Sequence, residues 1–170
     1  GAATVSVYLD DVSLTTRNLY SQGTAEPRFF DIQDIEVLRG PQGTLYGASS
    51  MGGTIKYIGK QPDLKYFSGS ATETWSWTKG GSQNYEVQGI LNIPMVKGQS
   101  ALRIGVVRGH ESGYIDQVDQ TTLKKIASDI NKSDYTVAKA ALKVAMSDDW
   151  SVTPALFVRV GDGAVRAQGY

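Results

Sequence analysis

The chain has 170 residues, enough for one ordinary domain with a real core, and its 17 Lys and Arg residues balance 17 Asp and Glu residues. No basic field therefore favours a nucleic-acid partner, and the absence of cysteine excludes a disulfide framework or a thiolate metal site. No window of 18 apolar residues and no charged-then-apolar leader occurs, so neither a transmembrane helix nor a signal peptide is expected.

The first 38 residues predict two strands with an irregular connection. Residues 5–12 alternate apolar and polar side chains, as a half-buried strand does, and two aspartates mark its end. Residues 13–30 are a polar mixture without a period, which indicates a loop. Residues 29–35 place apolar side chains three apart and predict a short helical turn, and residues 36–38 predict a short strand.

A glycine-rich core follows, bounded by apolar runs at residues 35–38 and 55–58. A phosphate-binding loop would need a lysine after its last glycine, where Thr54 and Ile55 stand, and no Gly-x-Gly-x-x-Gly fingerprint occurs. The pattern favours a tightly folded structural connection between two strands, with little side-chain chemistry. The residues of this core are Gly40, Pro41, Gly43, Gly47, Gly52 and Gly53.

After residue 62 the glycine-rich turns give way to long segments in which apolar and polar residues alternate. Apolar side chains on one face and polar side chains on the other, with tryptophans near the ends, are typical of strands that face lipid outward and water inward. Glu73 breaks the apolar row of the first strand, and Pro154 is a misfit in the last. The predicted strands cover residues 67–77, 85–93, 102–113, 138–146 and 152–160.

The connections between these strands alternate in length. Residues 79–83, 94–99 and 147–150 are short, whereas residues 114–134 form a long loop, as expected of a barrel with longer loops outside the cell. Within this loop Leu123, Ile126, Ala127 and Ile130 lie at helical spacing and predict a short amphipathic helix.

Side chains that could carry catalysis are scarce. His110 is the only histidine, and we interpret it as a residue near a strand end. Asp129, Asn131 and Asp134 lack the glycine and closing glutamate of a calcium loop, and no serine lies in a nucleophile elbow. We therefore expect no metal, no cofactor and no enzymatic activity.

The glycine core carries a family resemblance. The run D-I-E-V-L-R-G-P-Q-G-T-L-Y-G at residues 34–47, G-G-T-I at residues 52–55 and V-Y-L-D-D-V at residues 7–12 together resemble the plug-domain signature of TonB-dependent outer-membrane receptors. The resemblance covers about residues 5–62. It implies a β-rich fold, with the C-terminal part of an α+β plug at residues 1–62 and about five antiparallel up-and-down strands of an incomplete transmembrane β-barrel at residues 63–170. Since such barrels have roughly 22 strands, we expect the chain to be a fragment whose N-terminal part was lost or removed.

The resemblance also implies a function. The parent receptor would lie in the cell outer membrane and import a scarce ligand, such as a ferric siderophore, another metal chelate, cobalamin or an oligosaccharide. Its energy would come from TonB through segments outside this chain, and its partners would include outer-membrane lipid but no nucleic acid. The residues that match the plug signature are Glu36, Arg39, Gly40, Pro41, Gly43, Tyr46, Gly47, Gly52 and Gly53. A plug loop facing the ligand would contain Arg17, Asn18, Tyr20 and Arg28.

Two other interpretations stay open at this point. The chain could be an isolated β-rich fragment without transport activity, because open barrel strands leave edges unpaired. It could also be a soluble β-sandwich that binds a carbohydrate or a small apolar ligand. The sandwich predicts a closed sheet that buries Leu102, Leu142 and Leu156 together.

Overall fold

The computed structural model of the chain separates into two compact units, residues Gly1–Gln61 and Pro62–Tyr170. The structure describes residues 5–14, 28–47, 50–114, 117–118, 124–128, 132–147, 149–161 and 166–169.

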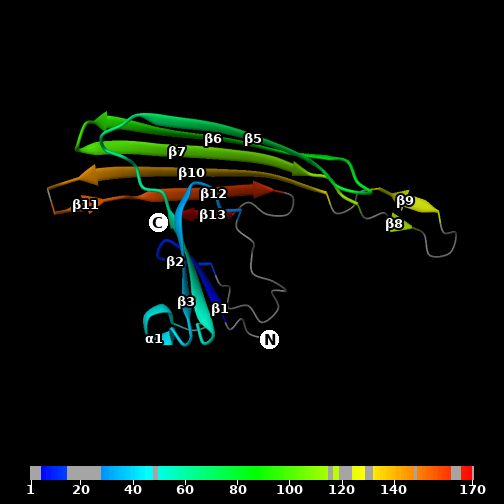
Figure 1. Cartoon of the computed structure of the whole chain (residues 1–170), viewed down its shortest axis with the longest axis horizontal. Helices are drawn as coiled ribbons and strands as arrows, with labels where there is room; N and C mark the ends of the chain where they lie inside the picture. Colours follow the sequence, from blue (N-terminus) through cyan, green and yellow to red (C-terminus); the bar gives the residue numbers. More distant parts are fainter. Residues whose placement is uncertain are drawn as a thin grey trace. The chain divides into compact units, whose positions relative to one another are not determined.

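The first unit is a four-stranded mixed sheet with the strand order β2-β1-β4-β3 (Figure 1). β1 and β4 run parallel, with Val7 opposite Ile55, whereas the β1–β2 and β3–β4 pairs are antiparallel. The parallel pair at the centre places β1 beside β4, and these strands lie near the two ends of the segment that resembles the plug signature. The elements are β1 (Val5–Leu9), β2 (Val12–Ser13), β3 (Ile32–Arg39), α1 (Gly43–Tyr46) and β4 (Gly53–Gly59).

The predicted helical turn at residues 29–35 is wrong, because β3 already begins at Ile32. Ile32 pairs with Gly59 of β4, and Phe29 packs against Tyr57 with a ring-centroid distance of 4.0 Å. The three-residue spacing therefore reflects packing against β4 and not a helix. Tertiary pairing overrides a local pattern of this length.

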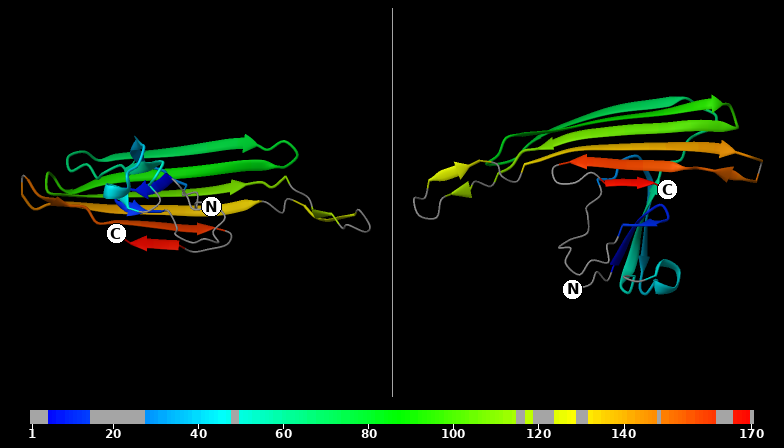
Figure 2. Two further views of the ribbon diagram at one scale, coloured as in Figure 1. Left: turned by 90° about the horizontal axis from the view of Figure 1, so that it is seen from below. Right: turned by 180° about the vertical axis from the view of Figure 1, so that it is seen from behind.

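The second unit is a seven-stranded antiparallel sheet in which sequence neighbours lie side by side, in the order β13-β12-β10-β7-β6-β5, with β11 also paired to β10 (Figures 1 and 2). The predicted β-rich class, a mixed sheet followed by an up-and-down sheet, is confirmed. The strands are β5 (Ser68–Trp77), β6 (Gln83–Val96), β7 (Ser100–Glu111), β10 (Ser133–Ala145), β11 (Ser151–Val152), β12 (Ala155–Gly161) and β13 (Arg166–Gly169).

The long connection between β7 and β10 contains a small hairpin of β8 (Gln117–Val118) and β9 (Lys125–Ala127) (Figure 1). The predicted helix is therefore wrong at Ile126 and Ala127, while Leu123 and Ile130 lie outside the described residues. A short helix bears a nucleation cost that few residues can repay, and pairing with β8 satisfies the backbone of β9 instead.

Pro154 is accommodated in the sheet without a shift in register. Val152 lies opposite Val144 and Ala155 opposite Ala141, so Pro154 stands directly opposite Leu142. Its ring removes a donor, but its carbonyl still accepts a 3.0 Å hydrogen bond from the Leu142 N–H. The misfit thus costs one ladder bond and separates β11 from β12.

Helices contribute little to the described part of the chain. Among the described residues, none lies in a helix long and apolar enough to cross a membrane.

Candidate functional site

The glycine-rich core of the first unit folds back on the sheet as a closed loop. Gly40 N–H donates to the Gly52 carbonyl at 3.3 Å, and Gln42 N–H donates to the Ser50 carbonyl at 2.8 Å. Between these contacts lies α1, a single helical turn that the sequence did not predict. The arrangement is a structural turn, as interpreted from the glycines.

Tyr8 and Tyr46 attach this loop to β1. The Tyr8 hydroxyl donates a 2.6 Å hydrogen bond to the Tyr46 carbonyl, and the two rings meet edge to face with centroids 5.2 Å apart. Such a pair adds roughly 0.5–1.5 kcal/mol beyond its buried area. The tyrosine of the plug-like signature thereby holds the tip of the loop.

Three hydroxyl groups beneath the loop form a buried cluster. Ser6 Oγ lies 2.6 Å from Ser50 Oγ and 2.9 Å from Thr54 Oγ1, and the three residues are at most 1% exposed. Each hydroxyl can donate and accept, and both hydrogen bonds join members of the cluster, so each of the three side-chain oxygens has a partner. It fastens the end of the loop to β1 and β4. These side chains gave no signal in the sequence, because small polar residues also occur in ordinary strands.

Gly53 marks the closest approach of two backbones in the first unit. Its φ is +155°, and a Cβ there would lie 2.7 Å from the Leu38 carbonyl oxygen. Only glycine therefore fits where the loop returns into β4 beside β3.

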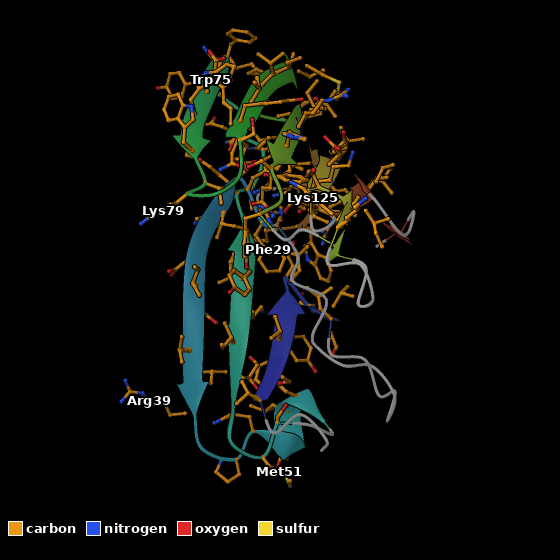
Figure 3. The ribbon with its side chains drawn as sticks, turned by 90° about the vertical axis from the view of Figure 1, so that its right-hand side faces the viewer. Phe29, Arg39, Met51, Trp75, Lys79 and Lys125 are labelled. Atoms are coloured by element: carbon orange, nitrogen blue, oxygen red, sulfur yellow. The ribbon has the colours of Figure 1, made fainter. Side chains whose placement is uncertain are left out.

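The charged residues of the plug-like signature lie at the surface of the first unit. Glu36 is exposed and stands opposite Lys56 of β4, and Arg39 points away from the end of β3 (Figure 3). Lys56 Nζ also donates to Asp11 Oδ1 at 2.9 Å. This hydrogen bond is the main reason why the pKa of Lys56 is raised above its usual value of 10.5.

The expected ligand-facing loop is only partly visible. Arg17, Asn18 and Tyr20 lie outside the described residues. Arg28 is half-buried, just before β3, and interacts with its surroundings. The grouping of these four residues therefore stays a prediction.

The sheet of the second unit has one apolar face and one mixed face, here called the polar face, on which polar side chains accompany the buried apolar residues Ile90, Val107, Val137 and Phe157. Strand register and the alternation of side chains place serines and threonines of β5, Asn92 of β6 and Arg103 of β7 on one face, together with Lys139 and Lys143 of β10. The opposite face holds three successive transverse rows that contain only apolar residues or glycine. These rows are Ala71, Gly89, Val106, Ala138 and Val158; Gly69, Leu91, Ile104, Ala140 and Leu156; and Ile93, Leu102, Leu142 and Pro154.

In a soluble protein the apolar face of a sheet is buried, whereas here the apolar face is the exposed one. Val106 is 50% exposed and Leu156 is 48% exposed, whereas Arg103 on the polar face is only 7% exposed. Leu102, Leu142 and Leu156 lie on this exposed face, so the burial that the soluble sandwich predicts is absent from the described sheet. An exposed face made of apolar rows indicates a lipid-facing surface.

The three apolar rows, from Leu102 to Val106 on β7, rise about 14 Å, and the strand extends beyond them at both ends. From Arg108 to Ser100 the strand rises about 27 Å, or about 20 Å after a tilt of roughly 40°. This is close to the ~25 Å apolar band of outer-membrane barrels. The strands are therefore long enough to cross the hydrocarbon layer.

Two transverse rows border the apolar band at the end that carries the long connection. The first, which we name the aromatic row, consists of Trp75, Tyr85, His110 and Asp134, each opposite the next. Trp75 and Tyr85 rings lie 5.8 Å apart, Tyr85 and His110 stack at 5.6 Å, and His110 Nδ1 lies 2.7 Å from Asp134 Oδ1. The second, the charged row, lies one row nearer the apolar band and consists of Glu73, Val87, Arg108 and Thr136.

Glu73 thus lies at the border of the band and not in its middle. The register of β5 and β6 puts Glu73 next to the row of Trp75. His110 belongs to the same border, near the end of β7, as interpreted from the sequence.

Asn92 is a structural residue that sequence reasoning missed. It is completely buried, accepts a hydrogen bond from Asp63 N–H at 2.8 Å, and donates to the carbonyls of Asp63 and Tyr66 at 3.0 and 2.8 Å. The Leu64 carbonyl accepts a further bond from Gly98 N–H at 2.9 Å. The segment that leads into β5 is therefore fixed on β6 and its turn.

A mixed sheet that carries a glycine-rich loop and an antiparallel sheet with an exposed apolar face are the two features expected of a plugged outer-membrane protein. Comparison with known sequences agrees. A family model for the TonB-dependent receptor plug domain matches residues 1–54. Over 59 residues the chain is 44% identical to the pesticin receptor of Yersinia enterocolitica, and the matched segment covers 35% of this chain and 8% of that receptor. Over 72 residues it is 36% identical to the ferrioxamine B receptor of Salmonella typhimurium, 38% of this chain and 10% of that receptor.

Solved structures extend the similarity beyond the plug-like segment. The ferric yersiniabactin uptake receptor of Yersinia pestis superimposes with a TM-score of 0.65 and 25% identity, over 93% of this chain and 23% of that receptor. The ferripyoverdine receptor of the outer membrane of Pseudomonas aeruginosa gives a TM-score of 0.66 at 22% identity, over 91% of this chain and 18% of that receptor, and shows the shared fold.

Residues 1–54 thus match the plug domain of the TonB-dependent receptors, and the chain as a whole is similar to parts of TonB-dependent outer-membrane receptors. It spans only a small part of the length of the relatives that it matches, at most 10% of the two receptors matched by sequence and 23% of the Yersinia pestis structure. Since members of this family are transporters, the prediction that the chain is not an enzyme is confirmed.

Proposed function

We propose that the receptor to which this chain belongs imports a ferric siderophore across the outer membrane. The observation that carries this proposal is the similarity of the plug segment to two receptors, one of them named for ferrioxamine B. The fold shared with receptors named for ferric yersiniabactin and ferripyoverdine supports the same class of ligand. The alternative ligands are another metal chelate, cobalamin or an oligosaccharide. An uptake experiment distinguishes them from a ferric siderophore.

The domain boundary that we propose lies at residue 62. Residues 1–62 form the C-terminal part of the plug, and residues 63–170 form the first strands of the barrel. The division of the chain into units at Gln61 and Pro62 supports this assignment. So does the hydrogen bonding of residues 63–66 to β6, which attaches them to the second sheet.

In this function the glycine core serves as a scaffold and performs no covalent chemistry. Its loop is closed by a few backbone bonds and by the hydroxyl cluster, so it can separate from the sheet as one piece. Energy from TonB, delivered through segments outside this chain, would shift the plug and let the ligand pass. Glu36 and Arg39, exposed on β3, are proposed to contact groups outside the first sheet.

Arg17, Asn18, Tyr20 and Arg28 are proposed to face the ligand. They lie in the segment between β2 and β3, which is polar and has no period. Arginine and tyrosine side chains suit the oxygen-rich surface of an iron chelate, since both donate hydrogen bonds and arginine carries a fixed charge.

Uptake of radioactive iron by cells that make the protein tests the proposal. We expect saturable accumulation from one of ferrioxamine B, ferric yersiniabactin or ferripyoverdine, and its loss in a strain without TonB. Arg28→Gln should weaken uptake, whereas Lys97→Gln, an equal charge change in the turn after β6, should leave it unchanged. Uptake of cyanocobalamin or an oligosaccharide but of no iron chelate would contradict the siderophore assignment. Iron uptake that persists without TonB would contradict the energy source.

A further inference from the structure

Arg108 is the basic side chain of the charged row on the otherwise apolar face. It is exposed, and its direct cross-strand neighbours are Val87 of β6 and Thr136 of β10, neither of which is acidic. Along its own strand, Val106 precedes it on the same face and His110 follows. We propose that Arg108 and the adjacent aromatic row form a binding site for the phosphate of a lipid headgroup in the outer leaflet.

The position of Arg108 fits the headgroup level. The cost of an arginine on the lipid face of a barrel is high at the bilayer midplane and falls to little near the interfaces. Tryptophan and tyrosine rings prefer that interface, and the row of Trp75 and Tyr85 lies immediately beyond Arg108. The long stem of Arg108 can lie along Val106 while its guanidinium reaches the polar layer.

The chemistry of the side chain selects the ligand. A guanidinium is always charged and presents a planar fork of donors that matches two phosphate oxygens. Glu73 lies in the same row, but Val87 stands between them, so their backbones are about 9–10 Å apart. Asp134 is oriented toward His110 Nδ1. Neither carboxylate pairs directly with Arg108, whose guanidinium therefore accommodates a single phosphate, with Tyr85 of β6 at the diagonal position.

The leaflet follows from the connections. The charged and aromatic rows lie at the end of β7 from which the long connection with the β8–β9 hairpin departs (Figure 1). Outer-membrane barrels place their longer loops outside the cell. The proposed occupant is thus a phosphate-bearing lipid of the outer leaflet, held between a cation and two amphipathic rings.

Lipid binding to the purified protein in neutral detergent tests this inference. Native mass spectrometry would compare phosphatidylglycerol with diacylglycerol, which has the same tails but no phosphate. We expect the protein to bind phosphatidylglycerol at least tenfold more tightly, and Arg108→Gln to remove that preference. Arg108→Lys should keep part of it, because the charge remains while the fork is lost. The matched control is Lys79→Gln, which removes an exposed charge from the turn after β5 and should change nothing (Figure 3).

Several results would overturn the site. These are an unchanged preference in Arg108→Gln, an equal loss in Lys79→Gln, or equal binding of the two lipids by the parent protein. Displacement of phosphatidylglycerol by millimolar inorganic phosphate would show a site for free phosphate instead of a lipid. If Arg108→Gln does not fold, the site is tested by the ratio of the affinities for phosphatidylglycerol and diacylglycerol, measured on the parent protein and on Arg108→Lys. The inference rests on the outer-membrane location and not on the identity of the imported ligand, so a failed uptake assay leaves this measurement valid.

Discussion

The phenol ring of Tyr135 lies over Gly109 of the neighbouring strand, and its hydroxyl donates a 2.6 Å hydrogen bond to Glu86 Oε2. Gly109 pairs with both Tyr135 and Glu86, so the tyrosine of β10 crosses β7 to reach β6. Tyr135 is 4% exposed. One side chain thereby fixes the register of three strands on the polar face.

Gly109→Ala should destabilise the second sheet by about 1–3 kcal/mol, because the added methyl would overlap the Tyr135 ring. Urea unfolding in lipid vesicles measures the loss. Gly89→Ala is the matched control, since a Cβ at Gly89 meets no atom within 4 Å. Equal stability of the two variants would show that the ring does not occupy this position.

Gly53→Ala should destabilise the first unit by about 1–3 kcal/mol, since it combines a strained backbone with an overlap on the Leu38 carbonyl. Gly43→Ala, in α1, should be tolerated because nothing lies within 4 Å of its added Cβ. Limited proteolysis of the loop, followed with time, compares the two. If Gly43→Ala is cut as fast as Gly53→Ala, the loop does not have the proposed close approach.

Asn92→Ala should release the segment that leads into β5. The substitution removes three hydrogen bonds and takes from the backbone groups of Asp63 and Tyr66 their partner on β6, at a cost of about 1–3 kcal/mol. Amide hydrogen exchange at Asp63 should accelerate strongly, while exchange in the middle of β7 should not change. Protection of the Asp63 amide in Asn92→Ala would argue against the anchoring role.

Asp63 should make the stability of the second unit depend on pH. Backbone N–H groups of Lys65 and Tyr66 donate to its carboxylate at 2.7 and 3.1 Å and lower its pKa below the usual 3.8. Its stabilising contribution is therefore present above pH 3.8 and is lost as the pH falls through the folded-state pKa. In urea unfolding, the stability advantage of the parent over Asp63→Asn should be constant near neutrality and shrink below pH 3.8. An advantage that grows on acidification would have the wrong sign.

The faces of the second sheet could be predicted from the sequence because alternation is a local property. In β10, for example, alternation alone separates Ala138, Ala140 and Leu142 from Lys139 and Lys143, as the register does. The alignment of the strands could not be predicted, since register depends on pairing between distant residues. Only the register shows that Glu73 and Arg108 share one row at the border of the apolar band.

The two wrong helix predictions also come from pairing between distant residues. Residues 29–35 and 123–130 carry helical spacing, yet Ile32 pairs with Gly59 and Ala127 pairs with Gln117. A few residues of periodicity cannot outweigh ladder hydrogen bonds to a partner strand. Asn92 gave no signal because it occupies a polar position of an alternating strand, and its partners at Asp63 and Tyr66 are far away in the sequence.

The central claim is that the second sheet faces lipid with one side only, and accessibility of spin labels tests it most directly. Since the chain has no cysteine, Val106→Cys and Val107→Cys each provide a unique thiol, and these neighbours lie on opposite faces of β7. A nitroxide at position 106 in outer-membrane vesicles should collide more with oxygen than with a water-soluble nickel chelate. At position 107 it should be shielded from oxygen in the lipid. Equal oxygen accessibility at the two positions, or the reverse order, would contradict the account.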